Sequence, residues 1–178
     1  ELNPFPVYSD PTTLEAGNPK LMPEQVHAFE LRYFFRNDKM TLMPTLYYRR
    51  TYDAFTEVSK NINDSTLLIS FENLASDESA GMEFIFAFKV KKFLTINLSA
   101  NGYYNRIDAS NLGYSEEKSI FTWDTKLSAG IKAWKNAVIQ INTTYRAASL
   151  TPQGKYLPMF VMNTGFRQDI LNKKAAVT

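Results

Sequence analysis

The sequence predicts an all-β protein, an antiparallel up-and-down meander of about seven strands and the start of an eighth. Apolar and polar residues alternate with a period of two along most of the 178 residues, and almost no segment has the 3.6-residue period of a helix. Aromatic residues, which favour strands, reach 14% of the composition. The length favours one domain, residues 1–178.

The first three predicted strands cover residues 26–36, 40–51 and 66–90. The turn "NDK" joins the first two, and Ile62–Ser65 breaks the pattern before the third. Pro44 is a departure inside the second strand, because proline has no N–H to donate to a sheet ladder. Along the third strand, one face carries Phe84, Phe86 and Phe88, and the other carries Glu83, Ala87 and Lys89.

The fourth predicted strand runs from Leu94 to Tyr104. One face is apolar, with Leu94, Ile96 and Leu98, and the other carries amides and hydroxyls, with Thr95, Asn97, Ser99 and Asn101. Asn101-Gly102 is a hairpin signal, but the alternation passes through it without a change of phase. We therefore predict one uninterrupted strand here.

The remaining strands are predicted over residues 121–134, 137–146 and 160–170, with the start of another near 174–178. The connections alternate in kind. Two- or three-residue turns, "NDK", "KK" (within "VKKF"), "KN" and "NKK", alternate with longer connections near Ile62–Ser65, Asp108–Ser119 and Leu150–Lys155. If each strand pairs with its neighbour in sequence, all short turns lie at one end of the sheet and all long loops at the other.

Two architectures fit this alternation. A soluble β-sandwich, with Asp108–Ser119 and Leu150–Lys155 as a binding edge, packs its apolar faces on one another. A transmembrane β-barrel turns its apolar face to lipid, and short turns at one end with long loops at the other are its usual pattern. Ten residues from Leu94 span ~34 Å, or ~24 Å along the membrane normal at a 45° tilt, close to the ~25 Å apolar band of such barrels. We therefore favour a segment of a barrel.

Aromatic residues near the predicted strand ends resemble the girdles at membrane interfaces. This group contains Tyr47, Tyr48, Tyr52, Tyr103, Tyr104, Trp123, Tyr145, Phe35 and Trp134. Trp123 and Trp134 are an odd number of residues apart, so only a β-bulge between them can bring both onto one face.

The barrel interpretation makes the two faces of the sheet testable. The lipid-facing surface is predicted to contain Phe84, Phe86, Phe88, Ile96, Leu98, Leu127 and Ile139, and the opposite surface Asn97, Ser99, Lys126, Gln140 and Asn142. Candidate lumen-lining residues are Glu30, Arg32, Glu83, Lys89, Asn97, Asp124, Lys126, Lys132, Gln140, Arg146 and Arg167. Ion pairs between the carboxylates and cations of this group are the expected role of the charged members.

Five segments, in order, resemble the outer-membrane β-barrel family of TonB-dependent receptors. They are "YSDPTTLEAGNPKLMPEQVHAFELRY", with its "GNP.L.PE" lead-in to a strand that has Glu30 in its middle, "LYYRRTYDAF", "FENLASDESAGMEF", "YNRIDASNL" and "PQGKYLPMFVMNTGFRQDIL". The resemblance covers nearly the whole chain. It implies a receptor in the outer membrane of a Gram-negative bacterium, which imports a scarce solute or oligomer.

The same resemblance implies partners. These are outer-membrane lipid, a plug domain and the TonB system, reached through parts of the chain not present here, and a surface lipoprotein. It supplies no catalytic or ligand residues. Since the chain begins at Glu1 and ends in "KKAAVT", which reads like the start of a strand, we expect a late wall fragment of a longer chain.

Other function classes find no support in the residues. The formal net charge of +2 with scattered Lys and Arg argues against nucleic acid. The absence of Cys excludes disulfides and thiolate metal sites, and the single His27 has no partner at metal-ligand spacing. No phosphate loop or nucleophile–His motif occurs, so no enzyme activity and no cofactor is expected, including that of a barrel enzyme. No apolar run reaches the ~18 residues of a transmembrane helix.

A wall fragment leaves free strand edges at residues 26–36 and near 174–178, and exposed edges recruit other strands. Three arrangements satisfy them: further strands of a complete barrel, closure of these strands as a small barrel, or pairing of two copies. We expect the first, because the strand stagger of a wide barrel does not suit closure with few strands.

Overall fold

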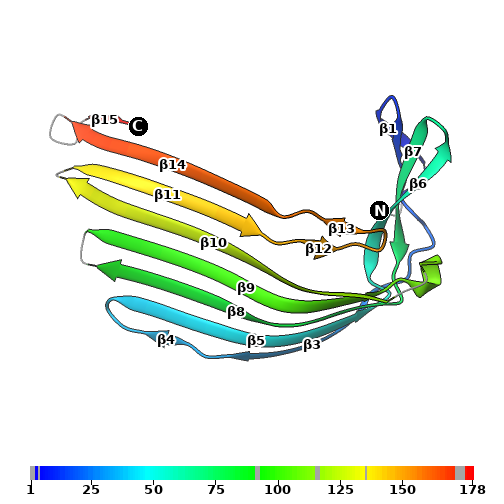
Figure 1. Cartoon of the computed structure of the whole chain (residues 1–178), viewed down its shortest axis with the longest axis horizontal. Coiled ribbons are helices and arrows are strands. Elements are labelled where there is room, and N and C mark those ends of the chain that lie inside the picture. Colours follow the sequence, from blue (N-terminus) through cyan, green and yellow to red (C-terminus); the bar gives the residue numbers. More distant parts are fainter. Residues whose placement is uncertain (1–2, 4, 91–92, 115–116, 135, 171–174) are drawn as a thin grey trace.

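The computed structural model describes residues 3, 5–90, 93–114, 117–134, 136–170 and 175–178. Its strands and one short 3-10 helix are β1 Val7–Asp10, β2 Thr13–Glu15, β3 Gln25–Arg32, β4 Phe35–Arg36, β5 Met40–Tyr52, β6 Phe55–Asn63, β7 Thr66–Asn73, β8 Ser76–Val90, β9 Leu94–Asp108, η1 Ser110–Leu112, β10 Lys118–Trp134, β11 Ala137–Arg146, β12 Ser149–Leu150, β13 Lys155–Tyr156, β14 Met159–Ile170 and β15 Ala175–Val177 (Figure 1). Among these residues, no helix is long and apolar enough to cross a membrane.

One long curved sheet, which we call the wall, has the strand order β15-β14-β11-β10-β9-β8-β5-β3, with β4 also paired to β5. All its pairs are antiparallel. Counting β3 and β4 as one interrupted strand, the wall is the predicted meander of seven strands with the start of an eighth in β15. β9 continues through Asn101-Gly102, so the uninterrupted strand is confirmed.

Two predicted strands differ from the structure. The stretch 66–90 is two strands, because the chain leaves the wall after β5 as the hairpin β6–β7 and returns at Leu74, whose N–H closes the hairpin base on the Ala54 carbonyl at 2.8 Å. The first strand is interrupted between β3 and β4. There the Tyr33 N–H donates to the Pro44 carbonyl at 3.0 Å, but Pro44 has no N–H to donate in return.

The wall has a turn end and a loop end, as predicted (Figure 1). The ends of β4, β8, β10 and β14 and the starts of β5, β9, β11 and β15 lie together at the turn end. The hairpin β6–β7, η1 and the hairpin β12–β13 lie at the loop end. The turn "NDK" is confirmed at Asn37–Lys39, whereas Lys91, Lys92, Lys135 and the "NKK" turn lie outside the described residues.

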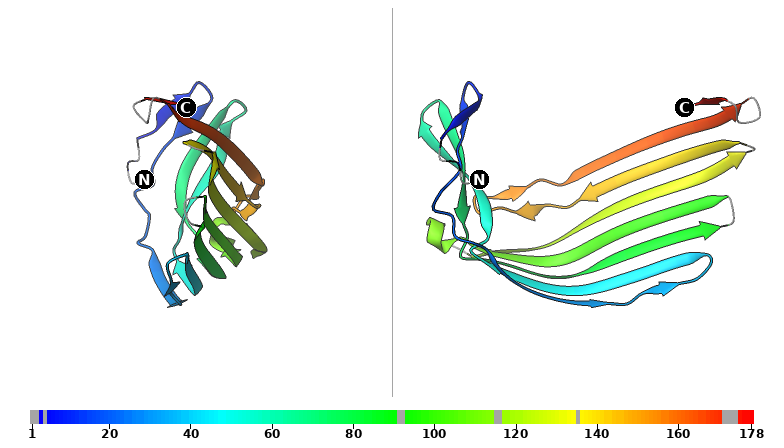
Figure 2. Two further views of the ribbon diagram at one scale, coloured as in Figure 1. Left: turned by 90° about the vertical axis from the view of Figure 1, so that its left-hand side faces the viewer. Right: turned by 180° about the vertical axis from the view of Figure 1, so that it is seen from behind.

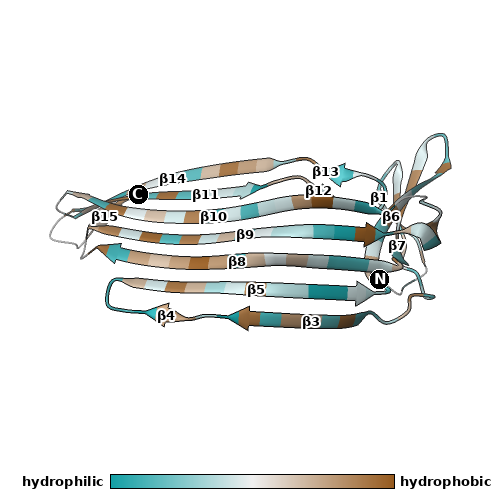
Figure 3. Cartoon of the chain, turned by 60° about the horizontal axis from the view of Figure 1, so that its bottom comes forward, coloured by the Kyte–Doolittle hydropathy of each residue, from teal (hydrophilic) through white to brown (hydrophobic). Residues whose placement is uncertain are grey.

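The pairing register separates the wall into the two predicted faces, since directly paired residues lie on the same side. Phe86 pairs with Leu98, Leu98 with Leu127, and Ile139 with Ile131 on one side, the apolar face. Asn97 pairs with Ser128 and Ser128 with Asn142 on the other, the polar face. Along the strands, hydropathy accordingly alternates from residue to residue (Figure 3).

The apolar face is open, which contradicts a sandwich. Phe29 is 69% exposed, Phe121 67% and Phe160 63%, and Phe84, Phe86 and Phe88 stack along β8 while half-exposed. Beyond Tyr48, Ala80 and Tyr104, this face becomes charged, with Arg50 paired to Glu78 and Glu78 to Arg106. The apolar band therefore ends at a row of aromatic side chains, as expected at a membrane interface.

Both tryptophans lie on the apolar face because β10 has an irregularity between Lys132 and Trp134. Trp123 contacts Tyr145 with ring centroids 4.5 Å apart, and Trp134 contacts Phe166 at 5.7 Å. Trp134 also donates from Nε1 to Gln168 Oε1 at 2.8 Å. The bulge without which the two tryptophans could not share a face is thus present, and the two rings lie toward opposite ends of the apolar band.

The wall is an open, curved sheet. Seen along its strands, it forms an arc, and β1, β6 and β7 lie on the concave side (Figure 2). Among the described residues, β3 and β15 do not pair with each other, so the chain does not close as a small barrel. Ile107, on the polar face, is 6% exposed beneath Ala54, Leu74 and Ala109 at the loop end. The polar face is therefore the concave one.

Candidate functional site

All of the candidate lumen-lining residues lie on the polar face by register. Glu30 pairs with Tyr47, Glu83 with Asn101, Asp124 with Arg146, Lys126 with Ser99 and Gln140 with Gly130. Lys89, Asn97, Lys132, Arg32 and Arg167 pair within the same set of alternating positions. The concave side of the wall is thus a continuous polar surface.

The structure brings the loop-side members of this set together around two neighbouring hollows. The first, of about 340 Å³, is lined by Glu30, Arg32, Glu83, Thr45, Tyr47, Arg49, Ser79, Asn101 and Tyr103. The second, of about 320 Å³, is lined by Tyr103, Asp124, Lys126, Arg146, Thr122, Trp123, Thr144 and Ser149. Tyr103 borders both hollows, which makes them parts of one surface.

A chain of hydrogen bonds crosses this surface. The Tyr47 hydroxyl donates to Asn101 Oδ1 at 3.1 Å, and Asn101 Nδ2 donates to Asp124 Oδ2 at 3.4 Å. Three strands, β5, β9 and β10, contribute to it. The arrangement holds an amide, a phenol and a carboxylate at fixed positions, which suits hydrogen bonding to a polar solute.

The predicted ion pairs form only in part. Glu30 and Arg32 are 3.6 Å apart, and Arg32 Nε also donates to Thr45 Oγ1 at 3.2 Å. Asp124 takes its hydrogen bond from the Asn101 amide, and no cation of the described residues lies within 4 Å of Asp124 or Glu83. Glu83 lies between Thr45 and Asn101, which carry no charge, whereas Asp124 lies opposite Arg146 without forming an ion pair with it.

Two residues of this surface, Tyr47 and Tyr103, were assigned by the sequence analysis to the aromatic girdle, and that assignment is wrong. Both pair with Gly81, from opposite sides, on the polar face. Tyr48 and Tyr104, one residue further, lie on the apolar face as predicted. Alternate residues of a strand point to opposite faces, so a residue's position in the strand decides its face, whether or not the residue is aromatic.

The turn-side members form a separate, cationic region of the polar face. Lys89, Lys132 and Arg167 lie here together with Arg36, which the sequence analysis did not single out. Asp169 is paired with Arg167 at 3.0 Å. Asn97 belongs to this region, where it lines a hollow with Arg36 and Lys89, and Gln140 lies in the same row of paired positions as Lys89. The structure therefore does not bring all of the predicted residues to one place.

The assignment of alternate residues of β9 to the polar and apolar faces can be checked with single cysteine substitutions, because the native chain has no cysteine. We expect Asn97→Cys and Ser99→Cys to react rapidly with a charged, water-soluble thiol reagent when the chain is in micelles or membranes. Ile96→Cys and Leu98→Cys should be protected, since detergent or lipid covers their face. Equal reactivity of all four would contradict the assignment of the apolar face to lipid; reaction in urea controls for intrinsic reactivity.

At the loop end, a second sheet stands on the concave side with the order β1-β2-β7-β6 (Figures 1 and 2). We call it the small sheet. β2 pairs with β7 in parallel, Leu14 opposite Leu68, so that a segment preceding β3 joins the hairpin between β5 and β8. In the β1–β2 turn, the Thr12 N–H donates to Asp10 at 2.8 Å, and this hydrogen bond lowers the pKa of that carboxyl.

Side-chain amides connect the small sheet to the other loop-end segments. Asn73, 9% exposed, donates to the carbonyls of Met22 at 2.9 Å and Asp53 at 2.6 Å, and accepts from the Met22 N–H at 2.8 Å. Asn111 donates to the Asn73 carbonyl at 2.7 Å. Asn18 donates to the Phe71 carbonyl at 3.0 Å. The loop end is thus one hydrogen-bonded assembly, which we call the loop platform.

In the β12–β13 hairpin, the side-chain amide of Gln153 hydrogen-bonds to the edge of β6 as the backbone of a neighbouring strand would, and this contact completes the platform. Its Oε1 accepts from the Ser59 N–H at 2.9 Å and its Nε2 donates to the Ser59 carbonyl at 2.7 Å, which covers part of the free edge of β6. Lys118 Nζ donates to the Pro152 carbonyl at 2.9 Å and fixes the same hairpin to β10.

The Gln153 contact makes a specific prediction. We expect Gln153→Ala to speed hydrogen exchange of the Ser59 amide by roughly fivefold, because one net hydrogen bond is worth about 1 kcal/mol. Gln153→Glu should retain part of the protection, since it keeps an acceptor for the Ser59 N–H but loses the donor. Unchanged exchange in both variants would show that the hairpin does not protect the β6 edge.

A sequence model of the outer membrane protein beta-barrel family matches residues 1–178. The chain belongs to this family. No curated protein matches the chain. Family membership places it in the bacterial outer membrane. In such barrels short turns face the periplasm and long loops face the outside, so the loop platform of this family member lies at the cell surface.

Proposed function

We propose that the chain is a wall segment of a TonB-dependent outer-membrane receptor that binds and imports a scarce solute or oligomer. It contributes binding and conduction, not catalysis. The observation that carries the proposal is the continuous polar face, with its two hollows joined by Tyr103, beneath a loop platform held by side-chain hydrogen bonds.

A passive wide pore needs a polar lumen, but it needs no built assembly over the entrance. Here the platform extends over the concave side (Figure 2) and is anchored by buried Asn73. Such an assembly supports recognition of the solute before it enters the lumen. Recognition is useful where the solute is scarce and its uptake consumes energy. The proposed partners are outer-membrane lipid along the apolar face, a plug and the TonB system through other parts of the protein, and a surface lipoprotein at the platform; nucleic acid is not among them.

We also propose that the wall is completed by further strands of a wider barrel. The free edges of β3 and β15 present backbone donors and acceptors, which in a bilayer have no water to satisfy them. Closure of these strands alone requires a tighter curve than the arc in Figure 2.

The test is uptake of a panel of labelled solutes by cells that carry the gene, cells that lack it, and cells that lack TonB. The proposal expects at least one solute whose uptake is lost in both deletion strains. Uptake that requires the gene but not TonB would identify a passive pore instead. Uptake that is unchanged for every solute would contradict a transport function.

A further inference from the structure

The apolar face of the wall carries a row of charged residues just beyond the aromatic side chains Tyr48 and Tyr104, toward the loop end. By register, this row contains His27, Arg50, Glu78 and Arg106. Two residues along a strand span ~7 Å, or ~5 Å along the membrane normal at a 45° tilt. The headgroup layer of a bilayer is about 5–8 Å thick on each side. With the aromatic row at the edge of the hydrocarbon, the charged row therefore lies at the depth of the lipid headgroups.

Within this row, Arg50 is held by two aromatic neighbours on the same face. Its Cζ lies 4.8 Å from the centroid of the Tyr52 ring, and the same ring meets the His27 ring nearly at right angles, with centroids 6.1 Å apart. His27 also pairs directly with Arg50 across β3 and β5. We call these three side chains the arginine cluster. A guanidinium that packs on an aromatic ring is fixed in position while its terminal N–H groups stay able to donate to an anion.

The charge of Arg50 is not compensated within the described part of the chain. No described carboxylate lies within 4 Å of it, and Glu78, its partner across the strands, accepts instead from the Tyr48 hydroxyl at 2.9 Å. Arg106, in contrast, is paired with Glu117. Among the described residues, Arg50 Nε is the one buried side-chain nitrogen or oxygen without a hydrogen-bond partner. A cation held without an acceptor is unfavourable, and an anionic group at its terminal nitrogens would stabilise it.

We propose that the arginine cluster binds the phosphate group of a lipid in the outer leaflet of the membrane. The guanidinium fork matches two phosphate oxygens, and the His27 ring adds a further N–H donor. Next to the aromatic row lie Leu46 and Met82, which are 52% and 48% exposed on the same face and suit the acyl chains of the same lipid. This continuity favours a lipid over a free phosphate ion, because a free ion gains nothing from the apolar surface.

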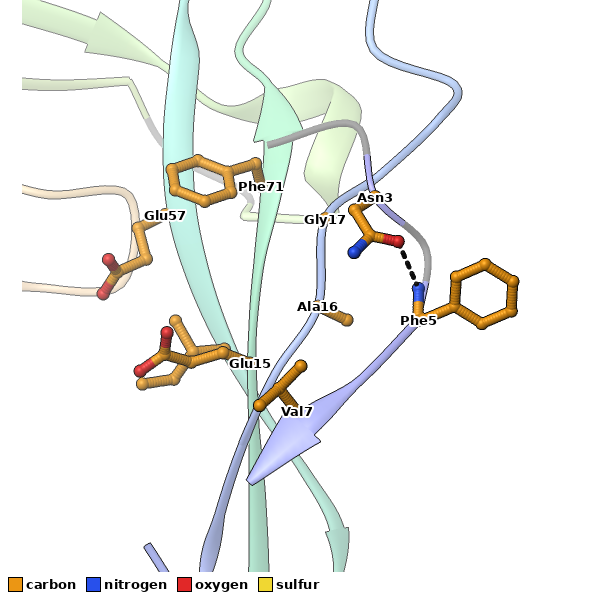
Figure 4. A pocket seen from close by; sticks show the side chains of 9 residues that line it. Asn3, Phe5, Val7, Glu15, Ala16, Gly17, Glu57 and Phe71 are labelled. Carbon is orange, nitrogen blue, oxygen red and sulfur yellow. Dashed lines mark hydrogen bonds between the residues drawn. The ribbon is translucent and has the colours of Figure 1, made fainter. Parts of the chain in front are cut away.

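Other charged regions of the chain fit a lipid phosphate less well. The hollow of about 320 Å³ on the small sheet is lined by Glu15 and Glu57, which extend to the same side of the strands (Figure 4), and no Lys, Arg or His of the described residues lines it. Its carboxylates repel phosphate. The cations of the turn end, such as Lys89 and Arg167, lie on the polar face, away from lipid. The inference depends on the apolar face meeting lipid and on the loop end facing outward, and it does not depend on TonB-driven import.

The experiment measures lipid binding by the chain refolded in nonionic detergent micelles. The probe is a phosphatidic acid with a dansyl group on one acyl chain, and energy transfer from the tryptophans to the dansyl group reports binding. A diacylglycerol with the same label is the matched control, since it has the same chains without the phosphate. Arg50→Gln removes the cation, Arg50→Lys keeps the charge without the planar fork, and Arg106→Gln removes a cation of the same row that is already paired. Circular dichroism checks that each variant folds.

We expect the native chain to bind the phosphatidic acid about tenfold more tightly than the diacylglycerol, as expected for charge-assisted hydrogen bonds at a half-exposed site. Arg50→Gln should abolish this preference, and Arg50→Lys should retain part of it. Arg106→Gln should change the affinity by less than about twofold, because an exposed, paired charge contributes little. Tyr52→Leu should weaken the preference and Tyr52→Phe should keep it, since the ring rather than the hydroxyl holds the guanidinium.

Three results would overturn the proposal, whatever the result of the uptake experiment. Equal losses in Arg50→Gln and Arg106→Gln would show a general attraction by surface charge without a site. Equal binding of the two lipids by the native chain, or binding of neither, would show that the phosphate is not recognised. Displacement of the phosphatidic acid by millimolar inorganic phosphate would identify a site for the free ion instead of a lipid.

Discussion

Replacing Gly81 by alanine is expected to lower the stability of the refolded chain by about 3 kcal/mol, because the added methyl group has no space. A Cβ built on Gly81 lies 2.5 Å from the Gly102 carbonyl oxygen, 2.5 Å from Tyr103 Cβ and 2.9 Å from Tyr103 Cα. These are backbone atoms and a Cβ, so no flexible side chain can move away. The substitution must separate β8 from β9 or rotate Tyr103 out of the two hollows.

Gly130→Ala is the matched control, since Gly130 also lies on the polar face in a central wall strand. A Cβ there meets no atom within 4 Å. Alanine in a strand interior is favoured over glycine by roughly 0.5–1 kcal/mol, so this variant should be as stable as the native chain or slightly more so. Urea unfolding in micelles measures both. Equal midpoints for the two variants would contradict the close approach of β8 and β9 at Gly81.

The wall could be predicted from the sequence because its physics is local to each strand. The period of two assigns Phe86 and Asn97 to opposite faces without any knowledge of the fold. Because one face must meet apolar surroundings, a shift of the strand pairing by one residue would expose the apolar side chains on the wrong face, so the pairing register is well determined. The alternation of short and long connections then fixes which ends lie together. The bulge before Trp134 was not predicted, because the odd spacing of the two tryptophans shows only that they need a bulge between them to share a face.

The small sheet could not be predicted by the same means. β7 contains Leu67, Leu68 and Ile69 in succession, so its alternation is lost where it becomes a central strand of the second sheet. Its partner β2 is only three residues long, and the parallel pairing joins positions far apart in the chain. Short strands without periodicity carry no local signal, and pairing between distant segments is decided by tertiary context.

The candidate site was predictable in its face but not in its contacts. The charged residues of the concave side were found by parity, whereas the Tyr47–Asn101–Asp124 chain depends on three strands and on side-chain conformations. The motifs that carried the family resemblance contain Asn18, Asn73, Asn111 and Gln153. The structure gives these amides a role that the sequence did not reveal, which is to hold the loop platform.

Replacing Asn73 by alanine should therefore release the platform while leaving the wall folded. The variant loses two donated hydrogen bonds and one accepted bond, and it leaves the Met22 N–H and the Met22 and Asp53 carbonyls without their partner. Buried groups left unsatisfied cost about 1–3 kcal/mol each, partly relieved by water, so we expect about 3 kcal/mol of local stability to be lost.

Hydrogen exchange separates this local effect from global unfolding. The amides of Ala16 and Leu67, which bond to the carbonyls of Ile69 and Thr12 across the β2–β7 pair, should exchange roughly a hundredfold faster in Asn73→Ala. Amides in the middle of β9 should not change. Asn73→Asp should be at least as damaging, since a carboxylate cannot donate to two carbonyls and is repelled by them, whereas Asn61→Ala, an exposed position in β6, should have no effect. If β9 exchanged as fast as β7 in Asn73→Ala, the platform and the wall would be one cooperative unit, and Asn73 would support the whole fold rather than the loop end alone.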